Sequence, residues 1–275
     1  QGVSSAASDV YKRQDLKVIT ALGGFGMTAI TAITAQNTMG VTRIQDLDLD
    51  VVEAQIDAVV SDIGVDVVKI GMLASPAIVR TVAACLKKHS IKKIVLDPVL
   101  RATSGVSLGG DDTAKTMVHE LFPLATIVTP NLYEASIFLG KPIASVGQFK
   151  EAAEQLLALG PKAVLIKGGH LEGEPKELVD YLIWHDRKDD VPVIFHKEFR
   201  HPRIPTSNTH GTGCSLSSAI ATYLADQHDL SHSVAKAISF VSAAIEAGQR
   251  LDIGKGPGPL WHMHDFYPTR LPEEQ

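Results

Sequence analysis

Short apolar runs alternate with segments of helical period along most of this chain, from Asp15 onward. The apolar runs are nearly unbroken and rich in β-branched residues, which is typical of strands buried on both faces of a sheet. They predict strands over Ile30 to Gln36, Val67 to Met72, Ile94 to Val99, Thr126 to Thr129 and Ala163 to Lys167. Two later runs, Val179 to Trp184 and Val193 to Phe199, flank a polar turn and predict a more exposed antiparallel pair.

The intervening segments carry apolar stripes at helical spacing, such as Ile78, Val82 and Leu86. Strands that alternate with helices favour an α/β fold, with helices on both faces of a mostly parallel sheet. No linker, internal repeat or low-complexity tract interrupts the pattern, so residues 15–275 are predicted to form a single domain. Ligands of such sheets bind beyond the carboxyl ends of the strands, so the chemistry is expected there.

The first 14 residues do not follow this pattern. They are mostly small and polar, end in Tyr11-Lys12-Arg13-Gln14, show no clear period and lack an initiator Met. We interpret residues 1–14 as a disordered or non-native lead ahead of the domain.

Composition narrows the class of protein. The formal net charge is -5 and the basic residues do not cluster, which argues against nucleic acid as a partner. The two cysteines, Cys85 and Cys214, cannot form a disulfide framework, which suits a reducing compartment. No apolar run approaches the roughly 18 residues of a membrane span, and no secretory signal is present. These features predict a cytoplasmic protein that does not enter a membrane.

The strongest chemical signal is the string Asn208-Thr209-His210-Gly211-Thr212-Gly213-Cys214, which precedes a segment of helical period. A Gly-Thr-Gly turn at a helix start lets backbone amides converge where the helix dipole is positive, which suits an anion such as a transferring phosphoryl group. A plain glycine turn with a threonine cap is the alternative.

Cys214 falls in the first turn of that helix, where the helix dipole is expected to lower the pKa of its thiol. The thiolate could accept a proton from a substrate hydroxyl or act as a nucleophile. A small packing residue is the alternative. Cys85, on an ordinary amphipathic helix, is expected only to pack.

Charged residues close the predicted strands. Asp97 ends one strand and Glu134 follows the next, so the two carboxylates could hold Mg²⁺ through water. Lys167 ends another strand and could meet ATP phosphates. The alternatives are an Asp-Pro turn at Asp97, a capping box that joins Asn131 to Glu134, and a solvated Lys167.

Two further residues suit a flat nitrogen heterocycle. Gln36 offers a hydrogen-bond donor and an acceptor together, which matches the edge of an aminopyrimidine. Met72 could pack against the face of a ring. A capping amide and a core methionine are the alternatives.

Taken together, these segments resemble the hydroxymethylpyrimidine/phosphomethylpyrimidine kinase family of the ribokinase-like superfamily. The match covers roughly Asp15 to Phe266. The segments that carry it, in order, are Asp15-Leu16-Lys17, Ala35-Gln36-Asn37-Thr38, Lys69-Ile70-Gly71-Met72-Leu73, Leu96-Asp97-Pro98-Val99, Thr129-Pro130-Asn131-Leu132-Tyr133-Glu134, Lys167-Gly168-Gly169-His170 and His210 to Cys214.

The resemblance implies a ribokinase-like three-layer αβα sandwich that uses ATP and Mg²⁺. It implies two successive phosphorylations in thiamine biosynthesis, of 4-amino-5-hydroxymethyl-2-methylpyrimidine and then of its monophosphate. Under this match Gln36, Met72 and Val99 contact the pyrimidine, and Asp97 and Glu134 serve Mg²⁺ and phosphate. A homodimer is compatible with the family.

The same resemblance assigns the phosphate side of the site. It implies that Lys167, Asn131 and Thr209 bind ATP and that Gly211–Gly213 form an anion hole. Cys214 occupies the position where sugar kinases of the superfamily carry a catalytic Asp.

The chain departs from the family at its start. The family begins with a strand and a segment of Gly-Thr-Asp-Ser-Gly-Gly type, which residues 1–14 do not contain. The sheet is therefore predicted to lose its first strand, and pyrimidine binding could be impaired. Pyridoxal kinase activity and a non-catalytic binding module are the competing interpretations. A thiol hydrolase using Cys214 and His210 explains the motifs less well.

Overall fold

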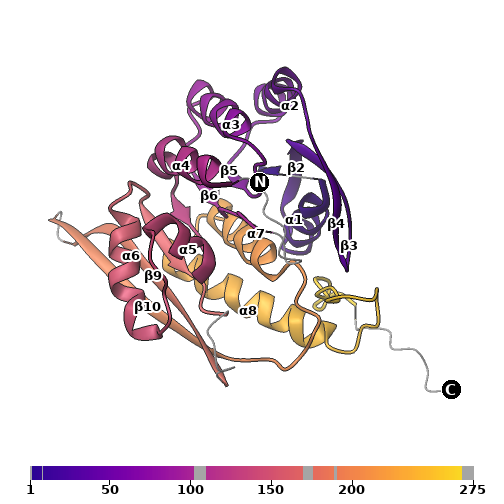
Figure 1. The fold of residues 1–275 in the computed structure, drawn as a ribbon, viewed down its shortest axis with the longest axis vertical. Coiled ribbons are helices and arrows are strands. Elements are labelled where there is room, and N and C mark those ends of the chain that lie inside the picture. Colours follow the sequence, from indigo (N-terminus) through magenta and orange to yellow (C-terminus); the bar gives the residue numbers. More distant parts are fainter. Residues whose placement is uncertain (1, 8, 102–109, 170–175, 189–190, 268–275) are drawn as a thin grey trace.

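The computed structural model describes residues 2–7, 9–101, 110–169, 176–188 and 191–267, and it confirms the predicted α/β architecture (Figure 1). Within this part of the chain, eight strands form one sheet in the order β10-β9-β8-β7-β6-β5-β1-β2. The strands are β1 (Gly2–Ala7), β2 (Phe25–Ile30), β5 (Val67–Ile70), β6 (Ile94–Leu96), β7 (Ile127–Val128), β8 (Ala163–Ile166), β9 (Glu177–Lys188) and β10 (Val191–Pro202).

Most of this sheet is parallel, from β8 through to β2. β9 pairs antiparallel with β8, and β10 pairs antiparallel with β9, which confirms the predicted hairpin. That hairpin is longer than the two apolar runs that predicted it.

Helices cover both faces of the sheet, as the alternation of strands and helices predicted (Figure 1). One face packs against α1 (Asp9–Ala21), α7 (Thr212–Ala225) and α8 (Leu230–Gly248). The other packs against α2 (Leu49–Asp62), α3 (Pro76–Lys88), α4 (Gly110–Glu120), α5 (Leu132–Leu139) and α6 (Phe149–Leu157). Neighbouring strand residues serve opposite faces: Val67 joins the first cluster and Val68 the second. Both faces are thus buried, which explains the unbroken apolar runs.

The predicted strand from Ile30 to Gln36 corresponds to β3 (Ala32–Asn37), which pairs antiparallel with β4 (Gly40–Asp46) in a separate two-stranded sheet. β2 of the main sheet shares only Ile30 with it and was not predicted. The central strands also end earlier than predicted. β6 ends at Leu96, since Pro98 has no N–H to donate to a sheet ladder.

The start of the chain differs from the expectation of a lost strand. The backbone of Gly2–Ala7 forms β1, which runs parallel to both β2 and β5. Asp9–Ala21 form α1. β1 therefore covers the edges of β2 and β5 that face it, and β2 is the outer strand of the described sheet. The non-native origin of residues 1–14 stays a prediction.

The β3–β4 hairpin lies against a loop near the C-terminus of the described chain. The backbone amides of Lys255 and Gly256 donate to Thr38 Oγ1 at 3.1 and 3.2 Å. A Cβ on Gly256 would lie 2.0 Å from the carbonyl oxygen of Thr38, so only glycine allows this approach. Two segments far apart in sequence are thereby joined at the edge of the site.

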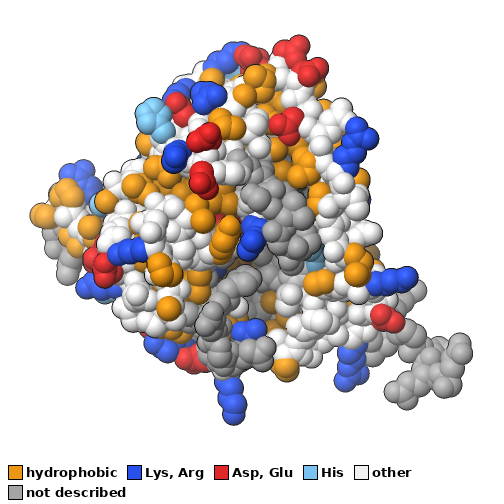
Figure 2. Space-filling view, in the orientation of Figure 1, with side chains coloured by type: hydrophobic (Ala, Val, Ile, Leu, Met, Phe, Trp, Pro, Cys, Tyr) orange, Lys and Arg blue, Asp and Glu red, His pale blue; other side chains and the backbone are white. Residues whose placement is uncertain are grey.

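The surface carries charges of both signs in a mixed distribution. Figure 2 shows positive and negative side chains interspersed on one face rather than gathered in a single patch. None of the described helices has the length and apolar character needed to cross a bilayer.

Candidate active site

The carboxyl ends of the central parallel strands present most of the predicted site residues. Met72, Asp97, Asn131 and Lys167 each come one to three residues after β5, β6, β7 and β8, respectively. Because parallel strands place these ends at one edge of the sheet, the residues can meet there.

The carboxylate of Asp97 connects several side chains at this edge of the sheet. It is 1% exposed and accepts hydrogen bonds from three side chains. Lys167 Nζ lies 2.8 Å and Thr129 Oγ1 3.2 Å from Oδ1, while Ser217 Oγ of α7 lies 3.2 Å from Oδ2. Burial alone would lower the pKa of Lys167, but Asp97 and Glu134 raise it on balance, so the ammonium stays charged.

A glycine cradle at the start of α7 faces this ion pair. Gly211 precedes the helix with a φ of 87°, a conformation that favours glycine, and no described side chain caps the helix start. A Cβ on Gly213 would lie 3.3 Å from Lys167 Nζ and 4.0 Å from Asp97 Oδ2. Glycine backbone, an ammonium and the positive end of a helix dipole therefore converge at one point, with the Gln14 side chain packed against Gly211.

The rest of the glycine string supports the turn. Thr212 Oγ1 donates to the carbonyl oxygen of Thr209 at 2.8 Å, which fixes the loop before the helix. Thr209 itself is exposed. His170, which follows the Lys167 motif, lies outside the described residues.

Glu134 forms the capping box that was the alternative to a metal ligand. Its Oε2 accepts from the Asn131 amide at 2.8 Å, and Asn131 Oδ1 accepts from the Glu134 amide at 2.9 Å. Burial raises the pKa of Glu134 to about 7; Lys167 opposes this shift and Asp97 adds to it. Added positive charge nearby would lower this pKa and stabilise the ionised carboxylate.

Cys214 is buried at the start of α7. The prediction that the helix N-terminus lowers its pKa is wrong: burial raises the pKa of the thiol to about 12. Lys69 and Lys167 oppose this rise, whereas Asp97 and Asp15 add to it. Without bound ligands the thiol is therefore protonated at neutral pH.

A second buried ion pair, absent from the predicted site, lies beside the first. Lys69 Nζ is 2.9 Å from Asp15 Oδ1, and both side chains are 0% exposed. Ser218 Oγ donates to the same Asp15 oxygen at 2.7 Å. Burial alone would lower the pKa of Lys69, but Asp15 and other anionic groups raise it on balance. The available sequence signal was a lysine inside the apolar strand β5.

An apolar wall adjoins the charged groups. Met72, Val99 and Cys214 form one buried cluster, which brings together three of the predicted site residues. Val41 and Ile44 of β4 pack against it. The sequence analysis missed β4, and with it these two contacts.

Gln36 lies on the hairpin that faces this wall. It pairs across the β3–β4 ladder with Val41, which packs on the Met72 cluster. Its Oε1 atom is buried and has no hydrogen-bond partner among the described residues. Because an unpaired buried acceptor is costly, this oxygen suits a donor on a bound ligand.

Asn208 anchors the loop that reaches the hairpin. Its Nδ2 donates to the carbonyl oxygens of Gly248 and Leu251 at 2.7 and 2.8 Å. The amide of His210 donates to the carbonyl oxygen of Gly258 at 3.0 Å. The glycine string is thus joined to the C-terminal loop, a role that the local sequence did not reveal.

His262, near the C-terminus of the described chain, is buried against α7. Its Nε2 lies 2.7 Å from Ser215 Oγ of α7, and both residues are buried. Burial lowers the pKa of His262 to about 4, and Lys17 and His264 contribute. The imidazole is therefore neutral and fixes the C-terminal segment to α7.

The donor set fits a hydrated divalent cation and phosphate. Oxygen ligands are those that Mg²⁺ prefers, and Mg²⁺ retains much of its water. Asp97 already accepts three side-chain hydrogen bonds and Glu134 caps α5, so contact through water fits these carboxylates better than direct ligation. The backbone at Gly213 faces the Lys167 ammonium, and this pairing suits a phosphate oxygen.

Known proteins match the chain in sequence and in fold. A family model described as phosphomethylpyrimidine kinase matches residues 13–261. A hydroxymethylpyrimidine/phosphomethylpyrimidine kinase of Rhizobium meliloti is 43% identical over 254 residues, covering 92% of this chain and 91% of that protein.

Two solved structures are also similar. The phosphomethylpyrimidine kinase of Clostridium difficile has 36% sequence identity and a TM-score of 0.73, over 89% of this chain and 99% of that one. The pyridoxal kinase of Staphylococcus aureus in complex with pyridoxal has 27% identity and a TM-score of 0.83, over 97% and 94%. The chain therefore belongs to the phosphomethylpyrimidine kinase family and has the predicted ribokinase-like fold.

Proposed function

We propose that this protein transfers a phosphoryl group from ATP to the hydroxymethyl group of 4-amino-5-hydroxymethyl-2-methylpyrimidine, and then a second one to the monophosphate, in thiamine biosynthesis. The observation that carries the proposal is the contact of Lys167, Asp97 and Gly213 beside the apolar cluster of Met72, Val99 and Cys214. A phosphate cradle and a wall for a flat ring thus adjoin.

The phosphate side of the site comprises Lys167, Asn131, Thr209 and Gly211–Gly213. ATP supplies the phosphoryl group when it is bound; the AMP-PCP complex of the Staphylococcus aureus pyridoxal kinase shows that a relative of this fold binds an ATP analogue. The Gly211–Gly213 amides stabilise negative charge that develops on the phosphoryl oxygens. Asp97 holds Lys167 in place, and with Glu134 it serves Mg²⁺ through water.

The pyrimidine side comprises Gln36, Met72 and Val99. The unpartnered Oε1 of Gln36 accepts from the exocyclic amine of the pyrimidine, and Met72 and Val99 contact the ring. Excluding water from this wall strengthens the nearby electrostatic contacts.

Cys214 lies where the two sides meet, and we assign it to the hydroxymethyl group. For the thiol to accept the hydroxyl proton, its pKa must fall in the substrate complex, and Lys69 and Lys167 are the groups that lower it. Phosphoryl transfer depends mainly on positioning and charge neutralisation, so contact can matter here more than ionisation. The acceptor of the second step is already a phosphate monoester, so a base matters less there.

The test is an ATP-consumption assay with hydroxymethylpyrimidine, its monophosphate and pyridoxal as acceptors, with and without Mg²⁺. We expect Mg²⁺-dependent turnover on both pyrimidines, and its loss in an Asp97→Asn variant that remains folded. Turnover on pyridoxal alone would replace the proposal with a pyridoxal kinase, which the 0.83 TM-score to the pyridoxal complex keeps as the second candidate. Folded protein that turns over none of these acceptors would be a binding module.

We further propose that residues 15–275 belong to one kinase domain, to which β1 and the start of α1 also contribute, that the protein is cytoplasmic, and that it forms a homodimer. The uniform sequence pattern and the absence of a membrane-crossing helix among the described helices support the first two proposals. Sedimentation velocity of the purified chain tests the third.

A further inference from the structure

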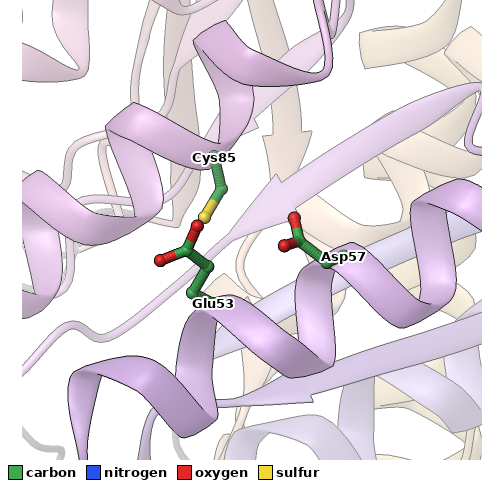
Figure 3. Close-up of side chains that lie close together, drawn as sticks. All are labelled: Glu53, Asp57 and Cys85. Carbon is green, nitrogen blue, oxygen red and sulfur yellow. The ribbon is translucent and has the colours of Figure 1, made fainter.

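We propose that Glu53, Asp57, Cys85 and His89 form a binding site for a borderline-soft divalent metal ion such as Zn²⁺. Glu53 and Asp57 lie four residues apart on α2, whereas Cys85 lies in α3 and His89 follows its last residue. One carboxylate oxygen from each acid and the Cys85 sulfur lie within 4.8 Å of one another (Figure 3). His89 Nε2 lies 2.6 Å from Asp57 Oδ1.

The spacing of these residues allows them to bind one metal ion together. Glu53 and Asp57, four residues apart, lie on the same face of α2, and Cys85 of α3 and His89 just after that helix offer two further donors. Thiolate, imidazole and carboxylate are the three donor types of protein zinc sites, which are almost always four-coordinate when structural. This donor set differs from the oxygen ligands expected for the magnesium of a kinase.

The state of Cys85 is the first independent observation that favours a metal. The residue is 2% exposed, and its sulfur makes no hydrogen bond to another described residue. Figure 3 shows the sulfur directed toward the Glu53 carboxylate, with Asp57 beside it. A metal cation bound there would take the sulfur as a thiolate, with release of the thiol proton.

Lys88 supplies the second observation, because it already acts as a cation for the same carboxylates. Its Nζ lies 3.0 Å from Glu53 Oε1 and 2.7 Å from Asp57 Oδ2. The Lys88 side chain is 51% exposed, and such surface ion pairs contribute little to stability. A divalent ion can therefore displace the ammonium, which then turns into solvent.

The location separates this site from the kinase chemistry. α3 follows β5 at the edge where Asp97 and Lys167 lie, and its last turn therefore reaches the opposite edge of the sheet, ahead of β6. A metal ion at Cys85 and His89 would join α2 to α3 and stabilise the fold without contact with the proposed substrates.

The test uses Co²⁺, which replaces Zn²⁺ and reports thiolate ligation by a near-ultraviolet charge-transfer band. The full chain is first treated with a chelator and then titrated with Co²⁺. We expect the band to form, to vanish in Cys85→Ser, to persist in Cys214→Ser, and to compete with Zn²⁺. Zn²⁺ should also raise the unfolding temperature of the unmodified chain.

A pair of lysine variants tests the competition. Lys88→Met should bind Co²⁺ about three- to tenfold more tightly, because the competing ammonium is gone. Lys87→Met is the matched control, since its partner is Glu120 at 3.1 Å and not the proposed ligands. A Co²⁺ band that survives Cys85→Ser, or no band at all, overturns the proposal. If Cys85→Ser does not fold, we expect Asp57→Asn to abolish the Co²⁺ band instead. A band that persists in Asp57→Asn would also overturn the proposal.

Discussion

Substitution of Gly213 should reduce catalysis without reducing the stability of the fold. A Cβ at this position would lie 3.3 Å from Lys167 Nζ, slightly closer than ordinary van der Waals contact. The ammonium ends a flexible side chain, so Gly213→Ala needs it to move only a few tenths of an ångström. The new methyl group, however, fills the cradle and disturbs the 2.8 Å contact between Lys167 and Asp97. The fold should tolerate the change, and the proposed phosphoryl site should not.

The magnitudes for Gly213→Ala follow from these contacts. Replacing Gly by Ala within a helix is neutral or stabilising by up to about 1 kcal/mol, so the unfolding temperature should not fall. Loss of one well-placed donor to a developing oxyanion costs about 10²- to 10³-fold in turnover, and we expect a loss of this order in both steps.

The assay measures ADP release with hydroxymethylpyrimidine and with its monophosphate, alongside thermal unfolding of the same preparation. Gly147→Ala is the matched control, because the nearest atom to its added Cβ is Ser145 Oγ at 3.8 Å, away from the site. The control should retain full activity. If Gly213→Ala also keeps turnover within about threefold of the unmodified protein, the cradle is not the phosphoryl site and the assignment of Gly211–Gly213 is refuted.

Three further predictions concern the surrounding contacts. Asn208→Ala leaves one buried and one partly buried carbonyl oxygen, of Gly248 and Leu251, without this donor, so urea unfolding should show a loss of about 2–4 kcal/mol. A loss below about 0.5 kcal/mol would contradict the anchoring role. The pKa of His262 is about 4 in the folded protein and 6.5 in its ordinary state, so the unfolded chain binds more protons between these values. The free energy of unfolding should therefore rise with pH from about 4 to 6.5, by up to about 3 kcal/mol, and a His262→Asn variant should lack this part of the pH dependence. Alkylation of Cys214 by iodoacetamide, measured in a Cys85→Ser background, should rise about tenfold per pH unit from pH 7 to 10, because the pKa of the free-enzyme thiol is about 12; a plateau near pH 8 would show an ionised resting thiol.

The sequence predicted the parts of the site that local pattern determines. Asp97 and Lys167 were identifiable because each is a charged residue that ends an apolar strand, and such strand ends face ligands in α/β sheets. Gly211 and Gly213 were identifiable because a glycine turn before a helical segment is a local signal. The contact between Asp97 and Lys167 followed from the topology, since the strands that precede them, β6 and β8, are central and belong to the parallel part of the sheet.

Other features depend on pairings that no local pattern encodes. Lys69 meets Asp15 across 54 positions of the chain, and Asn208 holds carbonyls some 40 residues away. β2 was missed because glycines at its start, Gly24 and Gly26, interrupt the apolar pattern. The pKa of Cys214 was predicted to fall because of the helix dipole, which is a local effect. Burial by several elements instead raises this pKa.

The two ion pairs explain why α7 is both buried and polar at its start. Consecutive residues, Ser217 and Ser218, donate to Asp97 and to Asp15, and these carboxylates pair with Lys167 and Lys69, respectively. Each pair brings opposite charges together, so the helix start gains a fixed position without a large net charge beneath it. The positive potential of the phosphate cradle therefore comes from Lys167 and from the backbone amides at the start of α7. Since one helix carries the cradle, Cys214 of the apolar wall and both serines, a shift of α7 would move the phosphate and pyrimidine sides together, and this fixes their relative position.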